Sequence, residues 1–103
     1  MSIQNRQPNQ VHLEFNENKN SGSQEVILDK KKIGMIHGQV DNPKASFDLV
    51  IEDKAGNEKF KRVGCQNDAG RWGERIDLDL TDNYYNVRIE NVKGAKTVDL
   101  FLE

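Results

Sequence analysis

Residues 46–63 read SFDLVIEDKAGNEKFKRV and carry the clearest structural signal in the chain. Apolar Phe47, Leu49 and Ile51 alternate with polar residues, with Val50 as the exception, which is the period of a strand that buries one face. The letters DKAGN then provide a short glycine-containing connection of the kind that joins the two strands of a hairpin. We therefore predict two antiparallel neighbouring strands, one on each side of DKAGN.

The same period of two recurs in the rest of the chain. Apolar residues that alternate with polar ones are Val11, Leu13 and Phe15, then Trp72, Ile76 and Leu78, then Tyr85, Val87 and Ile89, and finally Val98, Leu100 and Leu102. Turn residues separate the runs at intervals of about 8 to 12 residues, and no window has the apolar spacing of an amphipathic helix. Gly34 and Gly38, inside the run IGMIHGQV, indicate a bulge or a close approach of backbone.

These runs predict an all-β fold with one core. We expect an antiparallel β-sandwich of jelly-roll or Greek-key type with about eight strands, and a small closed barrel is the alternative. The domain occupies residues 11–103, and residues 1–10 form a polar N-terminal arm that lacks a core of its own.

The arm, MSIQNRQPNQ, has two interpretations. It is either disordered, or it orders on a neighbouring subunit by adding backbone hydrogen bonds to an exposed strand edge. In the second interpretation the partner-binding residues are Ile3, Arg6, Gln7, Pro8 and Gln10.

Charge and hydropathy exclude several classes of partner. The chain has 15 Lys and Arg against 17 Asp and Glu, so it lacks the concentrated positive field that nucleic acid requires. The lysine run 30–32 either meets an acidic surface or blunts a strand edge. No apolar run is long enough for a bilayer, and the arm lacks the apolar segment of a signal peptide. We expect synthesis in the cytoplasm, with incorporation into a virion or another particle as one destination.

Residues 64–74, GCQNDAGRWGE, contain the single cysteine and the single tryptophan. The stretch reads as a turn between two strands. A catalytic cysteine needs a neighbouring base, and the only histidines, His12 and His37, are far along the sequence. We therefore predict that Cys65 is a structural thiol, with no partner for an internal disulfide.

The same stretch offers oxygen ligands for calcium in Asn67, Asp68 and Glu74. Asn, Asp and Gly are also the ordinary residues of turns, for reasons of backbone geometry. We predict no metal site and no cofactor.

Trp72 has the parity of Ile76 and Leu78, which places its indole in the core or at the edge of the core. If the loop turns the ring outward instead, it forms a sugar-stacking platform with Tyr84. The alternative glycan-binding set is then Trp72, Tyr84, Asp68 and Arg71.

Charged residues occupy the outward positions of three successive predicted strands. They are Arg75, Asp77, Asp79, Arg88, Glu90 and Asp99. One interpretation is a docking surface or a carboxylate pair for acid–base chemistry. The one that we prefer is a solvated face with opposite charges across strands.

Residues 46–103 resemble small bacterial β-sandwich modules, namely pre-peptidase C-terminal and carbohydrate-binding-like domains. The shared features are a D-L-x-I-x-D-x-x-G-N hairpin and a Y-x-V-R-I strand. The matching residues are Asp48, Leu49, Ile51, Asp53, Gly56 and Asn57, then Tyr85, Val87, Arg88 and Ile89. The resemblance implies a β-sandwich fold and a role in binding.

No motif in the sequence predicts an enzyme: it has no phosphate-binding glycine loop, no metal-ligand cluster and no nucleophile elbow. We expect a non-enzymatic structural or assembly protein that self-associates or docks onto a larger particle, for example as a decoration protein of a phage virion. The alternative is a carbohydrate-binding module that uses exposed aromatic residues.

Overall fold

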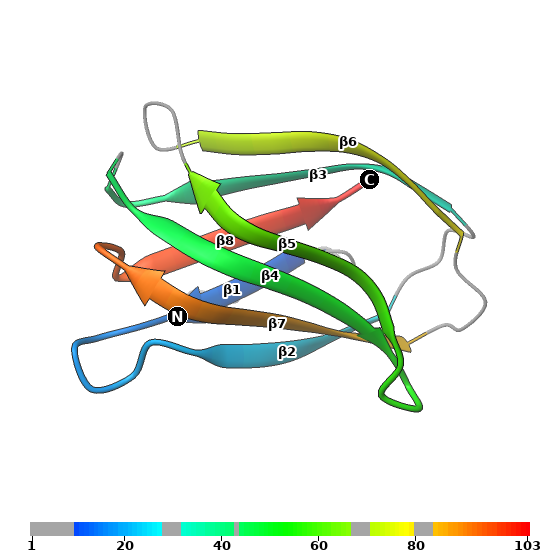
Figure 1. The fold of residues 1–103 in the computed structure, drawn as a ribbon, viewed down its shortest axis with the longest axis horizontal. Coiled ribbons are helices and arrows are strands. Elements are labelled where there is room, and N and C mark those ends of the chain that lie inside the picture. The colour runs from blue at the N-terminus through cyan, green and yellow to red at the C-terminus, as the bar shows by residue number, and fades with distance from the viewer. Residues whose placement is uncertain (1–9, 28–31, 43, 67–70, 80–83) are drawn as a thin grey trace, which may run out of the picture.

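The computed structural model describes residues 10–27, 32–42, 44–66, 71–79 and 84–103. Within them the chain forms β1 (Gln10–Glu14), β2 (Gly22–Ile27), β3 (Lys32–Val40), β4 (Ser46–Asp53), β5 (Glu58–Gln66), β6 (Arg71–Asp79), β7 (Tyr84–Lys93) and β8 (Thr97–Leu102). The strands form two four-stranded antiparallel sheets, in the orders β1-β8-β3-β6 and β2-β7-β4-β5 (Figure 1). The predicted antiparallel β-sandwich is therefore confirmed. The arm lies outside the described residues except for Gln10, the first residue of β1.

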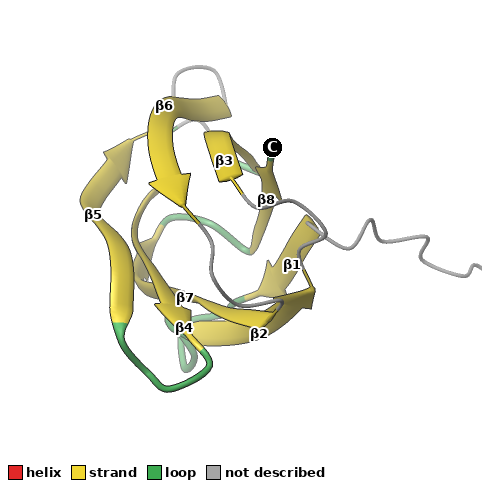
Figure 2. Cartoon of the chain, turned by 90° about the vertical axis from the view of Figure 1, so that its right-hand side faces the viewer, coloured by secondary structure: helices red, strands yellow, loops and turns green. Residues whose placement is uncertain are grey.

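The strand order follows one simple rule of pairing. β1 pairs with β8, β2 with β7, β3 with β6 and β4 with β5. A long hairpin of four strand pairs, rolled until alternate pairs lie in opposite sheets, has this order, and it is the order of a jelly roll. In the view along the strands the two sheets form two layers around the core (Figure 2).

The core lies between the inner faces of the two sheets, and the predicted parities are confirmed. Fully buried side chains include Leu49 and Ile51 of β4 and Val87 and Ile89 of β7. Val50 points outward yet is only 1% exposed. It lies opposite Arg88 on one side and Lys61 on the other, whose aliphatic stems can cover it.

Both predicted backbone features of β3 are present. The register with β6 shifts between Ile33 and Met35, so Gly34 lies at a bulge. A Cβ atom on Gly38 would lie 2.8 Å from Leu100 Cδ2 and 3.1 Å from the Asp99 carbonyl oxygen. Only glycine allows the two strands to approach this closely.

The predicted turn at residues 64–74 is shorter than the sequence indicated. β5 continues to Gln66 and β6 begins at Arg71, so only residues 67–70 separate the strands, and these lie outside the described residues. Gly64 misled the sequence interpretation because it belongs to a strand. It has φ +70° and donates its N–H to Asp48 Oδ1 at 2.8 Å, near a register shift in the β4–β5 pair.

The exposed edges of the sheets carry their own protection. Arg62 of β5 pairs with Glu74 of β6 and joins the edges of the two sheets, with Nε 2.7 Å from Oε1. On the other side, Gln24 Oε1 accepts the N–H of His12 at 3.1 Å, and Gln24 Nε2 donates to the Gln10 carbonyl at 3.1 Å. The two Gln24 bonds occupy backbone groups of β1 that an added strand would need. No helix in the described part of the chain could cross a membrane.

Candidate functional site

A row of side chains crosses the outer face of the β1-β8-β3-β6 sheet and ends one strand before the edge of the sheet. Gln10 lies opposite Phe101, Phe101 lies opposite His37, and His37 lies opposite Gly73. Residues directly opposite each other in antiparallel strands point to the same face. Gly73 has no side chain, so the row stops at His37 and leaves an open place at the edge strand β6.

The imidazole of His37 forms the wall of this open place. It stacks on the Phe101 ring, with centroids 5.1 Å apart and an angle of 17° between the planes. Its Nε2 atom lies 3.2 Å from Glu103 Oε1. Because β3 lies between β8 and β6, the face of the imidazole that Phe101 does not cover is turned toward Gly73.

The result is an open hollow of about 540 Å³, which we call the Gly73 hollow. Its lining residues are His37, Gly38, Gln39, Arg71, Trp72 and Gly73. Gln39 and Arg71 lie opposite each other, two residues along their strands from His37 and Gly73. A Cβ atom on Gly73 would lie 3.6 Å from His37 Cβ, which is ordinary van der Waals contact. The strand therefore has room for a larger residue here, and steric crowding does not explain the glycine.

The lining favours binding over bond-breaking chemistry. Among the described residues that line it, His37 and Arg71 are the ionisable ones, and none carries a hydroxyl or a thiol. A guanidinium stays protonated and donates hydrogen bonds. The hollow can therefore hold a flat ring against His37 and hydrogen-bond its substituents through Arg71 and Gln39.

The residues of the predicted sugar platform lie apart. Trp72 belongs to β6 and packs edge-on against Phe47 near the start of β4, with ring centroids 6.0 Å apart and an angle of 76°. Tyr84 begins β7 in the other sheet, next to the residue that faces Asp53 at the end of β4. The predicted core-edge position of Trp72 agrees with this packing. The alternative, one platform made of Trp72 and Tyr84, is not formed because the rings lie in different sheets and line different hollows.

The other members of the two predicted binding sets are divided. Arg71 lines the Gly73 hollow beside Trp72. Gln10 is half-buried, and its carbonyl is bonded to Gln24. Asp68, Ile3, Arg6, Gln7 and Pro8 lie outside the described residues.

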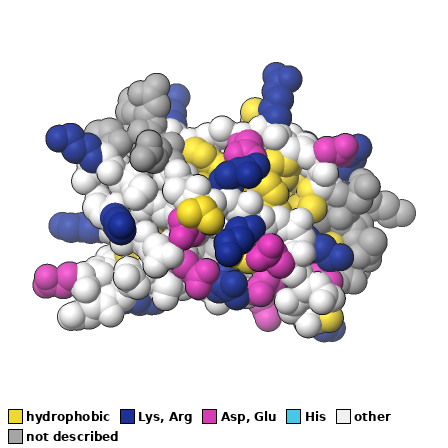
Figure 3. Space-filling model, in the orientation of Figure 1, with side chains coloured by type: hydrophobic (Ala, Val, Ile, Leu, Met, Phe, Trp, Pro, Cys, Tyr) yellow, Lys and Arg dark blue, Asp and Glu magenta, His cyan; other side chains and the backbone are white. Residues whose placement is uncertain are grey.

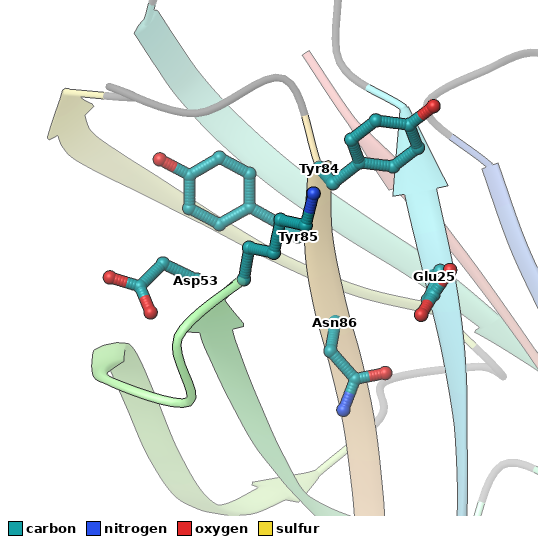
Figure 4. Close-up of a pocket in the computed structure, with 6 residues that line it drawn as sticks. Glu25, Asp53, Tyr84, Tyr85 and Asn86 are labelled. Carbon is teal, nitrogen blue, oxygen red and sulfur yellow. The ribbon is translucent and has the colours of Figure 1, made fainter.

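Tyr84 lines a second hollow of about 330 Å³ (Figure 4). Its other lining residues are Glu25, Asp53, Lys54, Tyr85 and Asn86. Tyr84 is 44% exposed, and Lys54 Nζ lies 5.7 Å from the centroid of its ring. The Lys54 ammonium group therefore lies where a ligand would have to stack on the Tyr84 ring.

The Asp53 carboxylate in this second hollow accepts hydrogen bonds from residues of the β4–β5 turn. Asp53 accepts the backbone N–H of Asn57 at 2.8 Å and that of Ala55 at 3.0 Å, and Asn57 Nδ2 donates to it at 3.1 Å. The hydrogen bond from the Asn57 backbone, above all, lowers the pKa of Asp53 below its usual value. Asp53 is thus ionised and structural, and the Tyr84 hollow is the weaker candidate.

Cys65 is placed as a structural thiol would be. It is 2% exposed, and burial, with the charges of Glu74 and Asp48 as further causes, raises its pKa to about 12. His12 and His37 both belong to the other sheet. His12 Nδ1 instead lies 2.5 Å from Asp99 Oδ1.

One of the three residues proposed as calcium ligands in the 64–74 stretch, Glu74, is already paired with an arginine. Glu74 binds Arg62 at the edge of the sandwich, and this hydrogen bond lowers the pKa of the Glu74 carboxyl. Asn67 and Asp68 lie outside the described residues. Among the residues that the structure does describe, no group of three His, Cys, Asp or Glu could hold a metal ion.

The outward charges are correctly placed by parity but do not form one surface. Arg75 and Asp77 of β6 and Asp99 of β8 belong to one sheet, whereas Arg88 and Glu90 of β7 belong to the other. The side chain of Asp79 is outside the described part. The visible face of the β2-β7-β4-β5 sheet mixes basic and acidic side chains (Figure 3). Cross-strand pairing agrees with a solvated face, the interpretation that the sequence favoured.

Comparison with known proteins finds likeness in structure alone. No family model and no curated protein matches the chain. The pre-peptidase C-terminal domain of a collagenase from Bacillus anthracis is similar with a TM-score of 0.60 and 8% identity, over 91% of this chain and 87% of that one. The carbohydrate-binding module TmCBM61, solved in complex with β-1,4-galactotriose, has a TM-score of 0.45 and 17% identity, over 91% of this chain and 66% of that one. The resemblance to pre-peptidase C-terminal domains is thus confirmed in the fold, and the chain is a β-sandwich domain similar to that of the collagenase.

Proposed function

We propose that this chain is a non-catalytic binding domain that holds a saccharide ring in the Gly73 hollow. The observation that carries the proposal is the missing side chain opposite His37, which leaves one face of a stacked imidazole turned toward an open place on the sheet. A ligand ring in that place continues the stack of Phe101 and His37 by one member.

The character of the hollow favours a sugar over an apolar side chain. The wall is a polar aromatic ring, 38% exposed, and the rim carries the amide of Gln39 and the guanidinium of Arg71. A saccharide has an apolar C–H face for the ring and hydroxyl groups for planar hydrogen-bonding side chains. A few placed polar groups beside a stacking surface are typical of small-molecule sites.

The test fills the hollow without disturbing the strand. In Gly73→Val a β-branched side chain, which suits a strand, stands beside His37. The matched control is Gly34→Val on β3, where a Cβ atom meets nothing within 4 Å. Trp72 lines the hollow and is the only tryptophan, so its fluorescence reports binding across a panel of oligosaccharides.

We expect at least one oligosaccharide to change the fluorescence of the wild-type protein and of Gly34→Val. Gly73→Val should bind that sugar at least tenfold more weakly and unfold at the same temperature. If Gly73→Val binds as tightly as the wild type, the ligand is somewhere else and the proposal fails. It also fails if no member of the panel binds.

A second candidate function is assembly, either with a second copy or on a larger particle such as a virion. The observation in its favour is Val63, which is 66% exposed on the edge strand β5. Because Gln24 already occupies backbone groups of β1, an arm from a neighbour would add more readily at β5 than at β1.

Removal of residues 1–9 tests assembly. We expect the truncated protein to lose the oligomer measured by light scattering while its melting temperature is unchanged. Val63→Asp should have the same effect if β5 is the receiving edge. If the wild-type protein is monomeric across a concentration series and the truncation does not change its mass per particle beyond the residues removed, self-association is excluded.

A further inference from the structure

The charges around the Gly73 hollow are unequally partnered. On this sheet, each carboxylate whose contacts are described lies close to a basic group. The pairs are Asp99 with His12 at 2.5 Å, Glu14 with His12 at 3.6 Å, Glu103 with His37 at 3.2 Å and Asp77 with Lys32 at 2.8 Å. Three of these carboxylates thus lie beside a histidine and one lies beside a lysine, so each has a nitrogen group of the same sheet close to it.

Two arginines of the same face differ from these carboxylates. Arg71 and Arg75 are exposed, and neither forms an ion pair with any residue that the structure describes. They occupy the outward positions of β6 on either side of Gly73, each about 7 Å from it along the strand. The open place beside His37 therefore lies between the strand positions of two arginines, of which Arg71 lines the hollow.

We infer that the ligand of the Gly73 hollow is an acidic saccharide, a chain of uronic acid residues whose carboxylates pair with Arg71 and Arg75. The inference rests on the proposed function and names the class of sugar. A guanidinium presents two parallel N–H donors that match a carboxylate, and this geometry distinguishes a uronate from a neutral hydroxymethyl group. One sugar ring stacks on His37. The carboxylates of this sugar and of the next sugar in the chain reach the arginines along β6.

On the opposite sheet, both described arginines lie close to carboxylates. Arg88 on the outer face of β7 lies 3.0 Å from Glu52 and 3.4 Å from Glu90. Arg62, at the edge of β5, is bound to Glu74. The arginines that form no ion pair among the described residues are therefore those on either side of Gly73, where the side-chain row is interrupted.

The experiment compares each acidic sugar with its own neutral form. Trisaccharides of galacturonate, glucuronate and mannuronate are titrated at low salt beside their methyl esters, which keep the rings and remove the charge. Calorimetry or Trp72 fluorescence gives the dissociation constants. We expect at least one acid to bind about tenfold more tightly than its ester, with the advantage declining as salt is added.

Arginine variants connect that advantage to the hollow. Arg75→Gln, at a position outside the lining of the hollow, should reduce the affinity for the acid several-fold and leave the affinity for the ester within about twofold. Arg71→Gln should weaken binding of both sugars, and of the acid severalfold more than of the ester. Arg71→Lys keeps the charge but not the paired donors, so it should recover only part of the loss. Lys93→Gln, on β7 of the other sheet, removes the same charge and should change nothing.

The outcomes separate the inference from the function on which it rests. Equal affinity for acids and esters, or neutral sugars bound while no acid is preferred, overturns the inference and leaves the saccharide site in place. Failure of every sugar to bind overturns both. Polyglutamate that binds as tightly as the uronates would overturn the assignment to a saccharide and indicate an acidic peptide.

Discussion

The two outer faces of the sandwich have the same strand geometry and opposite chemistry. On the β2-β7-β4-β5 face, Arg88 lies between Glu52 and Glu90, and Val50 is buried beside it. On the β1-β8-β3-β6 face, Gly73 leaves a place empty and the arginines on either side lack partners in the described chain. An arginine held between two carboxylates stabilises the fold, whereas arginines beside an open place can accept a ligand.

The largest expected effect is the loss of stability when a charge replaces the buried valine of the β2-β7-β4-β5 face. Val50→Asp puts a carboxylate at a position that is 1% exposed, and we expect the free energy of unfolding to fall by about 3 kcal/mol. Val63→Asp makes the same change at a residue that is 66% exposed and should cost less than about 0.5 kcal/mol. Urea unfolding of both variants measures the contrast. Equal losses would show that the outer face does not bury Val50.

The next effect concerns the paired charges. Glu52→Gln removes the partner of Arg88 and weakens the bond from Asn86 Nδ2 at 3.3 Å, so we expect a loss of about 1 kcal/mol. Partial exposure of Arg88 keeps the figure small. Arg75→Gln on the other face should leave the free energy of unfolding unchanged. If Arg75→Gln is the more destabilising variant, the assignment of the faces is reversed.

Acid should weaken the fold through carboxylates that are bonded in the native state. Asp48 accepts hydrogen bonds from Asn91 Nδ2 at 2.7 Å and from the Gly64 backbone, and the Asn91 bond is the first cause that lowers its pKa. A folded pKa below the unfolded one gives stability that is complete above the unfolded value and is lost as pH falls through the folded value. The melting temperature should therefore decrease below about pH 4, near the pKa of a free aspartate.

A variant isolates the share of that effect that belongs to Asp48. Asp48→Asn should flatten part of the acid limb of the melting-temperature profile and lower stability at neutral pH. Asp77, on the other face, forms its ion pair with an exposed lysine. The control variant Asp77→Asn should leave the profile unchanged. An unaltered acid limb in Asp48→Asn would exclude that carboxylate as a contributor.

The smallest expected effect is in stability at the hollow itself. Gly73→Ala places a methyl group 3.6 Å from His37 Cβ, without a clash. Alanine also restricts the unfolded chain more than glycine does, so stability should stay equal or rise by about 0.5 kcal/mol. By contrast, Gly38→Ala must fit a Cβ 2.8 Å from Leu100 Cδ2 and should be clearly destabilised. A loss of stability in Gly73→Ala comparable to that in Gly38→Ala would assign the glycine to packing and not to binding.

Sequence reasoning located some parts of the candidate site and missed others. Arg71 was selected, but as a neighbour of Trp72 and Tyr84, which the structure separates. His37 was considered only as a base for Cys65. The signal for the hollow was present: Gly73 occupies an outward position in an otherwise regular strand, where a polar side chain is expected. Its meaning depends on the residue opposite, and the alternation within β6 does not identify that residue.

Alternation within a strand is local, because successive side chains point to opposite faces whatever the strand pairs with. The sequence by itself therefore specified which faces of β4, β7 and β8 point toward the core and that β4 and β5 form a hairpin, and it favoured an inward position for Trp72. Partners further apart in the chain were decided only by the tertiary structure. The pairing of β3 with both β6 and β8 brings residues 37, 73 and 101 into one row, and the alternation of strand pairs between the sheets sends Arg75 and Arg88 to opposite faces. The physical reason is that sheet membership and register depend on burying all the apolar faces together, which no single stretch of the chain can encode.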